Sequence, residues 1–369
     1  MLKRLYVDNY KCLVNFEANL GNLTLLLGPN GVGKSSVLDV VFALRLLLSG
    51  VGKITDAQIF PARTLTRWQS RPSQTIEVDA LLDNKVLTYR LEIEHQPKTR
   101  RARVMLERLT EQGKPLFEFI NGKVTLYRDD FSEGPTFSGD WSESALARVA
   151  PAEDNKRLTR FLDLMRKTLV CGLYPRGFVG ETTSEDAILS RDGNNFAAWY
   201  RHIFQERQDL VPDYIQALKD VITGFNGIRL EKIGQETRAF LVVFEEHNER
   251  FEIGLDELSD GQRAIIALYA LIHITAGQGY TLFLDEPDNY VALPEIQPWL
   301  MALSDACGDT VPQTVICSHH PELIDYLGSD HGLLISRESS GVATIRPIDV
   351  SSLEPGMKLS EFIARGWER

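Results

Sequence analysis

The chain has 369 residues, of which 43% are hydrophobic, so it is long enough to bury the core of one large or two ordinary domains. Its formal net charge of -11 argues against a protein that coats nucleic acid or an anionic membrane through its overall field, and leaves only local contacts with a polyanion. The longest apolar stretch, SVLDVVFALRLLL, contains Asp39 and Arg45 and is too short to span a bilayer. We therefore expect a cytoplasmic, soluble protein with no membrane partner.

Four cysteines stand at positions without metal-ligand spacing. Cys12, Cys171, Cys307 and Cys317 form no C-x-x-C pair, so the sequence indicates neither a zinc cluster nor a disulfide framework. We expect a reducing compartment, with the cysteines in the core.

The first fifty residues predict a strand, a glycine-rich turn and a helix. The apolar run LTLLL leads into GPNGVGKSS and then into apolar positions at helical spacing. From about residue 74 to residue 127 the pattern changes to short alternating or β-branched runs, such as TIEVDALL and VLTYRLEIE, separated by turn sequences. This second stretch predicts an antiparallel meander.

Residues 141–224 carry a helical pattern in pieces separated by Pro151, Pro175 and Pro212, without a sustained heptad repeat. Two or three strands return between residues 228 and 255. The remainder alternates helix and strand: a helix from Gln262, the strand YTLFLDE, a helix over about 294–307, the strand QTVICS, and a last strand pair and helix.

This order predicts an α/β core that is split in sequence by an inserted antiparallel β meander and a helical lobe. We expect the N-terminal half of the core at residues 1–70, the meander at 71–130, the helical lobe at 131–226 and the C-terminal half at 227–369.

A phosphate-binding loop is predicted at residues 28–35, because GPNGVGKS matches G-x-x-x-x-G-K-[ST] between a strand and a helix. Its backbone amides and the positive end of the new helix would face the phosphates. Lys34 would reach the β and γ phosphates, and Ser35 would bind Mg²⁺. The predicted nucleotide-binding residues are Asn30, Gly31, Gly33, Lys34, Ser35 and Ser36.

Two carboxylates end the apolar strand TLFLDE, where an α/β sheet opens onto its ligand. Asp285 suits magnesium, and Glu286 is placed to orient and deprotonate a water that attacks the γ phosphate. The alternative is a solvated acidic turn stopped by Pro287, which the phosphate loop upstream disfavours.

A second apolar strand, TVICS, ends in Ser318, His319 and His320. A histidine there could bond the γ phosphate and hold the attacking water. The alternative is a capped turn, with Ser318 leading into a helix near Pro321, and without the other motifs the residues favour that alternative.

The stretch LSDGQRAII has the form of a capping box, in which Ser259 caps a helix and Gln262 reaches back to the Ser259 backbone amide. Taken in order, GPNGVGKS, LSDGQ, TLFLDE and SHH resemble the Walker A, signature, Walker B and switch-histidine motifs of an ABC-type ATPase head. The resemblance covers about the first 50 residues and the stretch from Ile228 onward.

Within that family Lys34 corresponds to the phosphate-binding lysine, Ser35 and Asp285 to the magnesium ligands, and Glu286 to the catalytic carboxylate. Ser259, Gly261 and Gln262 correspond to the signature, which acts on the nucleotide of the opposite protomer. His319 falls at the catalytic switch position, with His320 as the alternative.

The spacing distinguishes branches of the family. Ser259 follows Lys34 by 225 residues, much farther than in transporter motor subunits. With the opening LKRLYVDNYKCL and the phrase DEPDNYV, the chain resembles the branch that includes RecF, the SMC and zinc-hook repair ATPases and the OLD-family ATPases. A long coiled coil and a zinc hook are absent from the sequence, and the 50 residues after His319 are too few for a Toprim nuclease.

The resemblance implies an ATP-hydrolysing, Mg²⁺-dependent switch whose two copies dimerise head to tail around ATP. It further implies coupling to DNA, or to a nuclease or toxin in a separate chain, in genome maintenance or phage defence. A transporter motor subunit and a nucleotide-binding scaffold without turnover are the alternatives.

Several features stay open. The glutamine that couples magnesium to the insertion could be Gln58, Gln69 or Gln74.

The run KTRRAR at residues 98–103, and Arg63, Arg67 and Arg71 around Trp68, could contact DNA phosphates, but a solvated hairpin and an exposed helix face explain them slightly better. An aromatic stripe at helical spacing indicates core or interface: Phe196, Trp199, Tyr200, Ile203 and Phe204. Five histidines receive no role: His95, His202, His247, His273 and His331.

Overall fold

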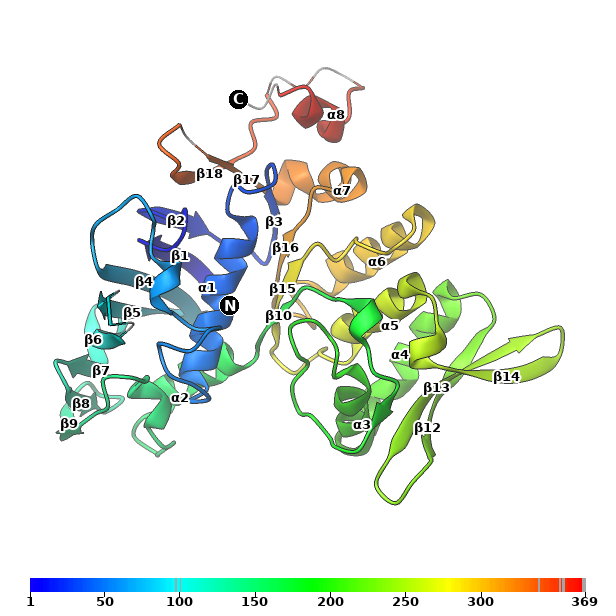
Figure 1. Ribbon diagram of the computed structural model, residues 1–369, viewed down its shortest axis with the longest axis horizontal. Coiled ribbons are helices and arrows are strands. Elements are labelled where there is room, and N and C mark those ends of the chain that lie inside the picture. Colours follow the sequence, from blue (N-terminus) through cyan, green and yellow to red (C-terminus); the bar gives the residue numbers. More distant parts are fainter. Residues whose placement is uncertain (97, 100, 338, 352, 354–355, 367–369) are drawn as a thin grey trace. The chain divides into compact units, whose positions relative to one another are not determined.

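The computed structural model describes residues 1–96, 98–99, 101–337, 339–351, 353 and 356–366 (Figure 1). The chain forms two compact units. Unit 1 comprises Met1–Thr168 with Leu327–Arg369, and unit 2 comprises Leu169–Tyr326. The four-part division expected from the sequence stays a prediction.

Unit 1 contains an eight-stranded sheet with the order β2-β1-β4-β5-β6-β7-β8-β9 and antiparallel pairing between neighbours. Its strands are β1 (Leu2–Asp8), β2 (Phe16–Asn19), β4 (Ser73–Leu82), β5 (Lys85–Gln96), β6 (Arg101–Glu111), β7 (Lys114–Ile120), β8 (Lys123–Tyr127) and β9 (Glu133–Ser138). The predicted meander is therefore confirmed. It runs on to Ser138, and β4 joins it to β1, a long-range pairing that the sequence does not reveal.

A second group of strands in unit 1 carries the phosphate loop. β3 (Leu23–Leu27) pairs in parallel with β17 (Gly332–Arg337), which pairs in antiparallel fashion with β18 (Ala343–Pro347). All five residues of β3 are buried, as expected for a parallel strand that is covered on both faces. The helices of unit 1 are α1 (Lys34–Leu48), α2 (Lys156–Arg166) and α8 (Leu359–Ala364), with 3-10 turns η1 (Ala62–Thr64) and η2 (Leu146–Arg148).

Unit 2 contains the strands that end in the acidic and histidine motifs. β15 (Thr281–Asp285) lies between β10 (Thr168–Cys171) and β16 (Gln313–Cys317), and the β15–β16 pairing is parallel. A separate antiparallel sheet has the order β11-β13-β12, with β14 also paired to β13. Its strands are β11 (Glu181–Thr182), β12 (Phe225–Lys232), β13 (Arg238–Glu246) and β14 (Glu249–Gly254).

Helices cover these strands in the predicted order. They are α3 (Phe196–Glu206), α4 (Val211–Val221), α5 (Asp260–His273), α6 (Leu293–Ala306) and α7 (Pro321–His331), with 3-10 turns η3 (Pro175–Gly177), η4 (Gln208–Leu210) and η5 (Leu255–Glu257). In α3 the aromatic stripe is core, because Phe196, Trp199 and Tyr200 are at most 2% exposed, and only Phe204 at the end of the stripe is exposed. The sequence missed β10, which lies within the stretch that it assigned to helices.

None of the four cysteines, all of which lie within the described residues, forms a disulfide, and Cys12, Cys171 and Cys317 are buried. Across the described ranges, the helices lack the combination of length and apolar character that a bilayer crossing requires.

Candidate functional site

The residues predicted to act on a nucleotide lie in both units, with the phosphate loop in unit 1 and the two strand ends and the signature in unit 2. In unit 1 the phosphate loop connects β3 to α1. Gly28 has φ +142°, and a Cβ there would lie 2.2 Å from the Ile335 carbonyl oxygen. Gly33 has φ +121°, and its Cβ would lie 2.8 Å from Cys12 Sγ. The loop therefore requires glycine at both positions for conformation and for space.

The Lys34 side chain bonds the backbone at the start of this loop. This side chain is buried, and Nζ donates to the carbonyl oxygens of Gly28 at 2.6 Å and of Pro29 at 3.3 Å. Ser35 and Ser36 follow in the first turn of α1, which contains no acidic residue, so the positive end of the helix is not neutralised from within. The arrangement provides a cradle for phosphate oxygens.

Arg337, which the sequence did not single out, braces the same loop. Its Nη1 donates to the Gly31 carbonyl at 3.4 Å, and its Nε donates to the Gly341 carbonyl at 2.8 Å. The guanidinium carbon lies 5.5 Å from the ring centre of Trp68, a cation–π contact. No sequence pattern connects residues this far apart, because only the pairing of β17 with β3 brings them together.

In unit 2 the structure brings Glu286 and His319 together. Glu286 follows β15 with φ +49°, and its backbone amide donates to the Cys317 carbonyl at 2.8 Å. His319 Nδ1 lies 3.2 Å from Glu286 Oε1, and Asn289 Nδ2 donates to Glu286 Oε2 at 2.9 Å. The carboxylate is thus oriented from two sides by groups at the ends of neighbouring parallel strands.

The two adjacent histidines have different contacts. The His320 backbone amide donates to Ser318 Oγ at 2.9 Å, and His320 Nδ1 accepts from the Glu322 amide at 3.2 Å. Ser318 and His320 therefore shape the start of α7, while His319 contacts the carboxylate. The capped-turn interpretation of the SHH run is confirmed for Ser318 and His320, and a contact of His319 with the γ phosphate stays a prediction.

Asp285 has a cationic neighbour that the sequence did not reveal. Arg191 Nη2 lies 3.9 Å from Asp285 Oδ2. Among the described residues, no group of three or more His, Cys, Asp or Glu side chains could hold a metal ion. Magnesium needs few protein ligands, since it keeps several waters and binds substrate phosphates. A serine hydroxyl and a carboxylate that already attracts a cation fit it, so Ser35 and Asp285 stay our proposed ligands.

The signature residues begin α5 and form the predicted capping box, which is confirmed. Ser259 Oγ accepts from the Gln262 amide at 3.2 Å, and Gln262 Oε1 accepts from the Ser259 amide at 3.1 Å. A Cβ at Gly261 would lie 3.0 Å from the Tyr290 carbonyl, so only glycine fits there without a shift. Asp260 bonds Arg176 Nε at 2.8 Å, which ties the helix start to η3.

Of the three candidate glutamines, Gln74 has a structural role, because its side chain is buried and hydrogen-bonded within unit 1. Its Nε2 donates to the Asn9 carbonyl at 2.9 Å and to Thr64 Oγ1 at 3.1 Å, and its Oε1 contacts His95 Nε2 at 2.8 Å. Burial lowers the pKa of His95 to about 4, so its imidazole is neutral and donates to Gln74. Gln58 is exposed and Gln69 is half-buried; the coupling glutamine stays open between these two.

The prediction of an exposed helix face at Arg63, Arg67 and Arg71 is wrong, since only η1 is helical there. Pro61 and Pro72 bracket the segment, and the Asn9 side chain binds its backbone, accepting from the Thr66 amide at 3.2 Å and donating to the Arg71 carbonyl at 2.9 Å. A loop that is pinned to a buried side chain satisfies its backbone groups without a helix.

Many basic side chains of the meander are paired. Arg103 Nε donates to Glu94 at 2.8 Å, and its guanidinium lies 5.3 Å from the Trp141 ring centre. Arg71 bonds Asp8 at 2.9 Å. Arg100, part of the KTRRAR run, lies outside the described residues. These carboxylates offset much of the positive charge that the sequence offered for DNA contact.

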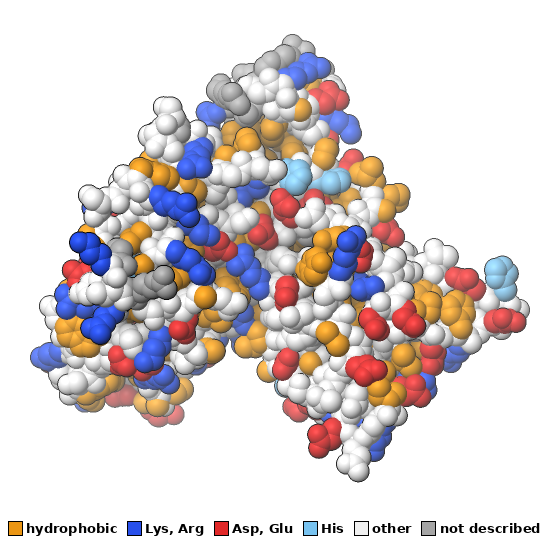
Figure 2. Space-filling model, viewed as in Figure 1, with side chains coloured by type: hydrophobic (Ala, Val, Ile, Leu, Met, Phe, Trp, Pro, Cys, Tyr) orange, Lys and Arg blue, Asp and Glu red, His pale blue; other side chains and the backbone are white. Residues whose placement is uncertain are grey.

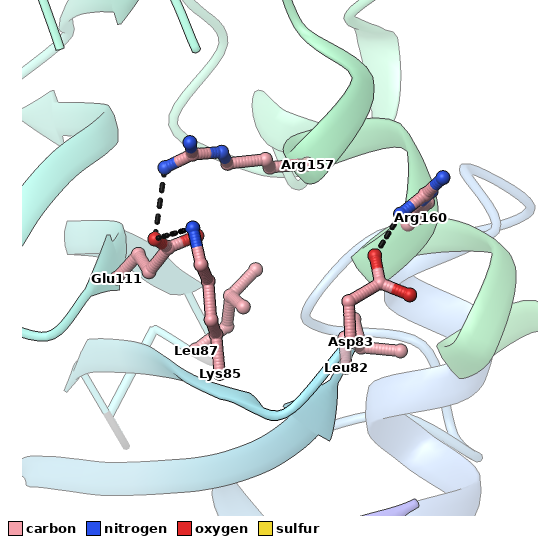
Figure 3. Close-up of a pocket in the computed structure, with 7 residues that line it drawn as sticks. All are labelled: Leu82, Asp83, Lys85, Leu87, Glu111, Arg157 and Arg160. Carbon is pink, nitrogen blue, oxygen red and sulfur yellow. Dashed lines mark hydrogen bonds and ion pairs between the residues drawn. The ribbon is translucent and has the colours of Figure 1, made fainter. Parts of the chain in front are cut away.

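Another basic cluster lies between the meander and α2, around a cavity of about 240 Å³ (Figure 3). The buried Glu111 carboxylate receives Lys85 at 3.1 Å and Arg157 at 2.8 Å, and Arg160 pairs with Asp83. Each of these cations has a carboxylate partner, so the cluster fixes α2 to the strands of the sheet.

The sequence matches the family described as "AAA domain, putative AbiEii toxin, Type IV TA system" over residues 23–325. A stretch of 41 residues is 49% identical to the OLD nuclease of Thermus scotoductus, and this match covers 11% of the chain and 8% of the nuclease.

Three solved structures are similar in fold. The SMC head domain from Thermotoga maritima has a TM-score of 0.49 at 16% identity, over 95% of this chain and 99% of that one. An SmcHead bound to the C-winged helix domain of ScpA has a TM-score of 0.56 at 11% identity, over 94% and 97%. The Smc head domain from Pyrococcus furiosus, with an extended coiled coil and bound to the C-terminal domain of ScpA, has a TM-score of 0.54 at 10% identity, over 100% and 98%.

The last two likenesses show the fold, a mixed α/β fold like that of an SMC head, which here carries the antiparallel meander. The family match covers most of the chain and includes the phosphate loop, the signature and both strand-end motifs. The chain therefore belongs to this AAA family, and its fold is similar to that of SMC heads.

Proposed function

We propose that this protein is an ATP-hydrolysing switch that dimerises around ATP and passes its state to DNA or to an effector. The contact between Glu286 and His319, directly after the Asp285 strand end, carries this proposal. A carboxylate held by an imidazole and an amide is suited to orienting a water, and a scaffold without turnover has no need of such a pair.

In the proposed reaction Glu286 accepts a proton from a water whose oxygen attacks the γ phosphorus. The bond from that phosphorus to the bridging oxygen breaks, which leaves ADP and inorganic phosphate. Lys34 would exchange its bonds to the Gly28 and Pro29 carbonyls for phosphate oxygens. Ser35 and Asp285 would hold Mg²⁺, which supplies neutralisation of the phosphate charge.

Charge supports a head-to-tail dimer. Unit 1 carries 30 Lys and Arg against 26 Asp and Glu, a net charge of +4, whereas unit 2 carries 10 against 25, a net charge of -15. Figure 2 shows the same contrast on the visible face, with more basic side chains on unit 1 and more acidic ones on unit 2. A contact between unit 1 of one copy and unit 2 of the other brings unlike charges together.

The same contact would bring the Ser259 helix start of one copy to the phosphate loop of the other. Each chain has one of each half-site, so a symmetric pair of chains is needed for a complete site. The positive end of α5, a 14-residue helix, is suited to a γ phosphate.

A separate effector chain is the partner that fits best with the relatives. The family description names a toxin of a toxin–antitoxin system, the Thermus scotoductus relative is a nuclease, and the SMC heads are bound to ScpA domains. DNA is the second candidate partner, through those basic side chains of unit 1 that carboxylates do not offset.

The test is Glu286→Gln. We expect phosphate release to fall about 100-fold or more while ATP binding persists, since proton transfer to a positioned base supplies a factor of this order. The variant should accumulate as a dimer in light scattering with saturating ATP. Lys34→Ala is the control and should lose ATP binding and dimerisation together. Release at the original rate would overturn the role of Glu286, and a monomer with saturating ATP would overturn the dimer.

A further inference from the structure

Arg191, the cation beside Asp285, is held in place by its own backbone. It lies in the connection between β11 and α3, where its carbonyl accepts from the Gly172 amide at 2.8 Å. The next carbonyl, that of Asp192, accepts from the Tyr174 amide at 2.9 Å. Asn195 Oδ1 accepts from the Ser190 amide at 2.8 Å and fixes the other side of the turn. Because these bonds fix the backbone of the loop, the Arg191 side chain leaves it in a defined direction.

The direction is toward the end of β15. Arg191 Nη2 lies 3.9 Å from Asp285 Oδ2, and a Cβ built on Gly172 would lie 3.4 Å from Asp285 Cβ. Both side chains of the ion pair are partly exposed, at 31% for Arg191 and 18% for Asp285. The pair is therefore exchangeable, because water and small ions can reach it.

Residues 172–176, whose first amide bonds the Arg191 carbonyl, also bond the start of the signature helix α5. Within residues 172–176, the Pro175 carbonyl accepts from Arg263 Nη1 at 2.9 Å, and Arg176 Nε donates to Asp260 Oδ2 at 2.8 Å. Asp260 and Arg263 are both in the first turn of α5, directly after Ser259. Residues 172–176 thus contact Asp285 and Arg191 at their first residue and the start of the signature helix at their last two.

We propose that Arg191 is a positioning residue that senses the cation at Asp285 and sets the signature helix accordingly. Without a metal–nucleotide complex, Arg191 supplies the positive charge beside Asp285. A divalent cation at this carboxylate repels the guanidinium, which releases the turn from residues 172–176 and so loosens their hold on α5. The inference rests on the proposed function and adds to it a route from metal loading to the signature.

The first test measures how much Mg²⁺ is needed for binding of a fluorescent ATP analogue, in the Glu286→Gln background. Arg191→Gln removes the competing charge, so the half-saturating Mg²⁺ concentration should fall roughly two- to fivefold, as expected for a partly exposed ion pair. Binding of the analogue in EDTA should not change. Arg191→Lys should keep the original Mg²⁺ requirement, and its normal circular dichroism would show that position 191 tolerates substitution.

A matched control is Arg207→Gln, which breaks another exposed arginine–aspartate pair of unit 2, with Asp209. It should leave the Mg²⁺ requirement unchanged. Asp285→Asn removes the partner itself, so adding Arg191→Gln to it should give no further shift. A further shift of the same size would overturn the proposed contact.

The second test follows amide hydrogen exchange at residues 172–176 and in the first turn of α5. With ATP, and at a protein concentration at which light scattering shows a monomer, exchange in the Glu286→Gln protein should be faster in Mg²⁺ than in EDTA. In Arg191→Gln it should be the same in both, which a merely structural role for Arg191 would not produce.

An unchanged or increased Mg²⁺ requirement in Arg191→Gln overturns the inference, since an increase would make Arg191 a phosphate ligand. Failure of the proposed function has a different signature. In that case the protein with the natural residues at 191 and 286 would not bind or hydrolyse ATP at all, and Lys34→Ala would have no effect.

Discussion

The phosphate loop of unit 1 and the strand ends of unit 2 are built by different means. In unit 1, Gly28 and Gly33 have positive φ and leave no room for a Cβ, so backbone shape decides the loop. In unit 2 the Glu286 backbone also has a positive φ, but its carboxylate is held by His319 and Asn289, so exchangeable side-chain contacts decide where the carboxylate points. A substitution in the first region should disturb the whole loop, whereas one in the second should remove one contact.

The largest expected effect comes from Gly28→Ala. The new Cβ would lie 2.2 Å from the Ile335 carbonyl of β17, at a φ of +142° that L side chains rarely adopt. We expect a loss of about 3 kcal/mol or more in the free energy of unfolding, together with the loss of ATP binding. Urea denaturation measures the first and a fluorescent ATP analogue the second.

Gly31→Ala is the matched control for Gly28→Ala. Gly31 also has positive φ, +81°, but a Cβ there has no atom within 4 Å. Only the conformational cost remains, about 1 kcal/mol. Equal losses in the two variants would show that close packing against β17 does not shape the loop.

Local motifs made the phosphate loop and the capping box predictable, because each is specified by residues within a few positions of one another. The meander was predictable from its alternation and from turns such as Asp83 and Asn84, which both have positive φ. β10 was not, since the four buried residues TLVC, so soon after a helix, give no periodicity that distinguishes a strand from more helix. The joining of β4 to β1 depends on pairing across some 70 residues, which no local pattern records.

The side-chain partners of the candidate site were less predictable than its motifs. The run SHH left His319 and His320 open, and only the turn after β16 directs one of them to Glu286. Arg191 follows no motif in the sequence, and it reaches Asp285 because β10 lies beside β15. The tertiary structure alone decides which loop residues lie beside a site, so their spacing along the sequence does not predict their contacts.

A buried histidine of unit 1, His95, and an exposed one of unit 2, His319, should differ in their effect on stability at low pH. Burial lowers the pKa of His95 to about 4, against 6.5 for an ordinary histidine. Between these values the unfolded chain binds a proton that the folded chain does not. Stability should therefore fall as pH drops from about 6.5 to about 4, with a total loss of about 2 kcal/mol after allowance for partial solvation.

Urea midpoints measured from pH 7.5 to pH 4 check this slope. His95→Gln can keep a bond to Gln74 without titrating, so it should lose this part of the slope. His319→Gln, at the exposed position of unit 2, should keep it. The same slope in His95→Gln as in the unmodified protein would contradict the assignment to His95.

A small change in stability is expected at Ser259, and substitutions there separate the two roles of this residue. Ser259 Oγ accepts from the Gln262 amide, so Ser259→Ala should cost about 1 kcal/mol as the loss of a helix cap. If Ser259 also contacts the γ phosphate of a second copy, Ser259→Ala should abolish ATP-driven dimerisation although the fold persists. Light scattering with ATP in the Glu286→Gln background measures this.

Ser259→Asn distinguishes a cap from a phosphate contact at the same position. Asparagine caps a helix about as well as serine, so stability in urea should be retained. Its longer side chain places an amide where a phosphate oxygen would approach the start of α5, so dimerisation should still fail. A dimer that forms normally in Ser259→Asn would leave Ser259 as a cap alone, and the signature function would then have to rest on Gly261, whose position against the Tyr290 carbonyl admits no side chain without a shift.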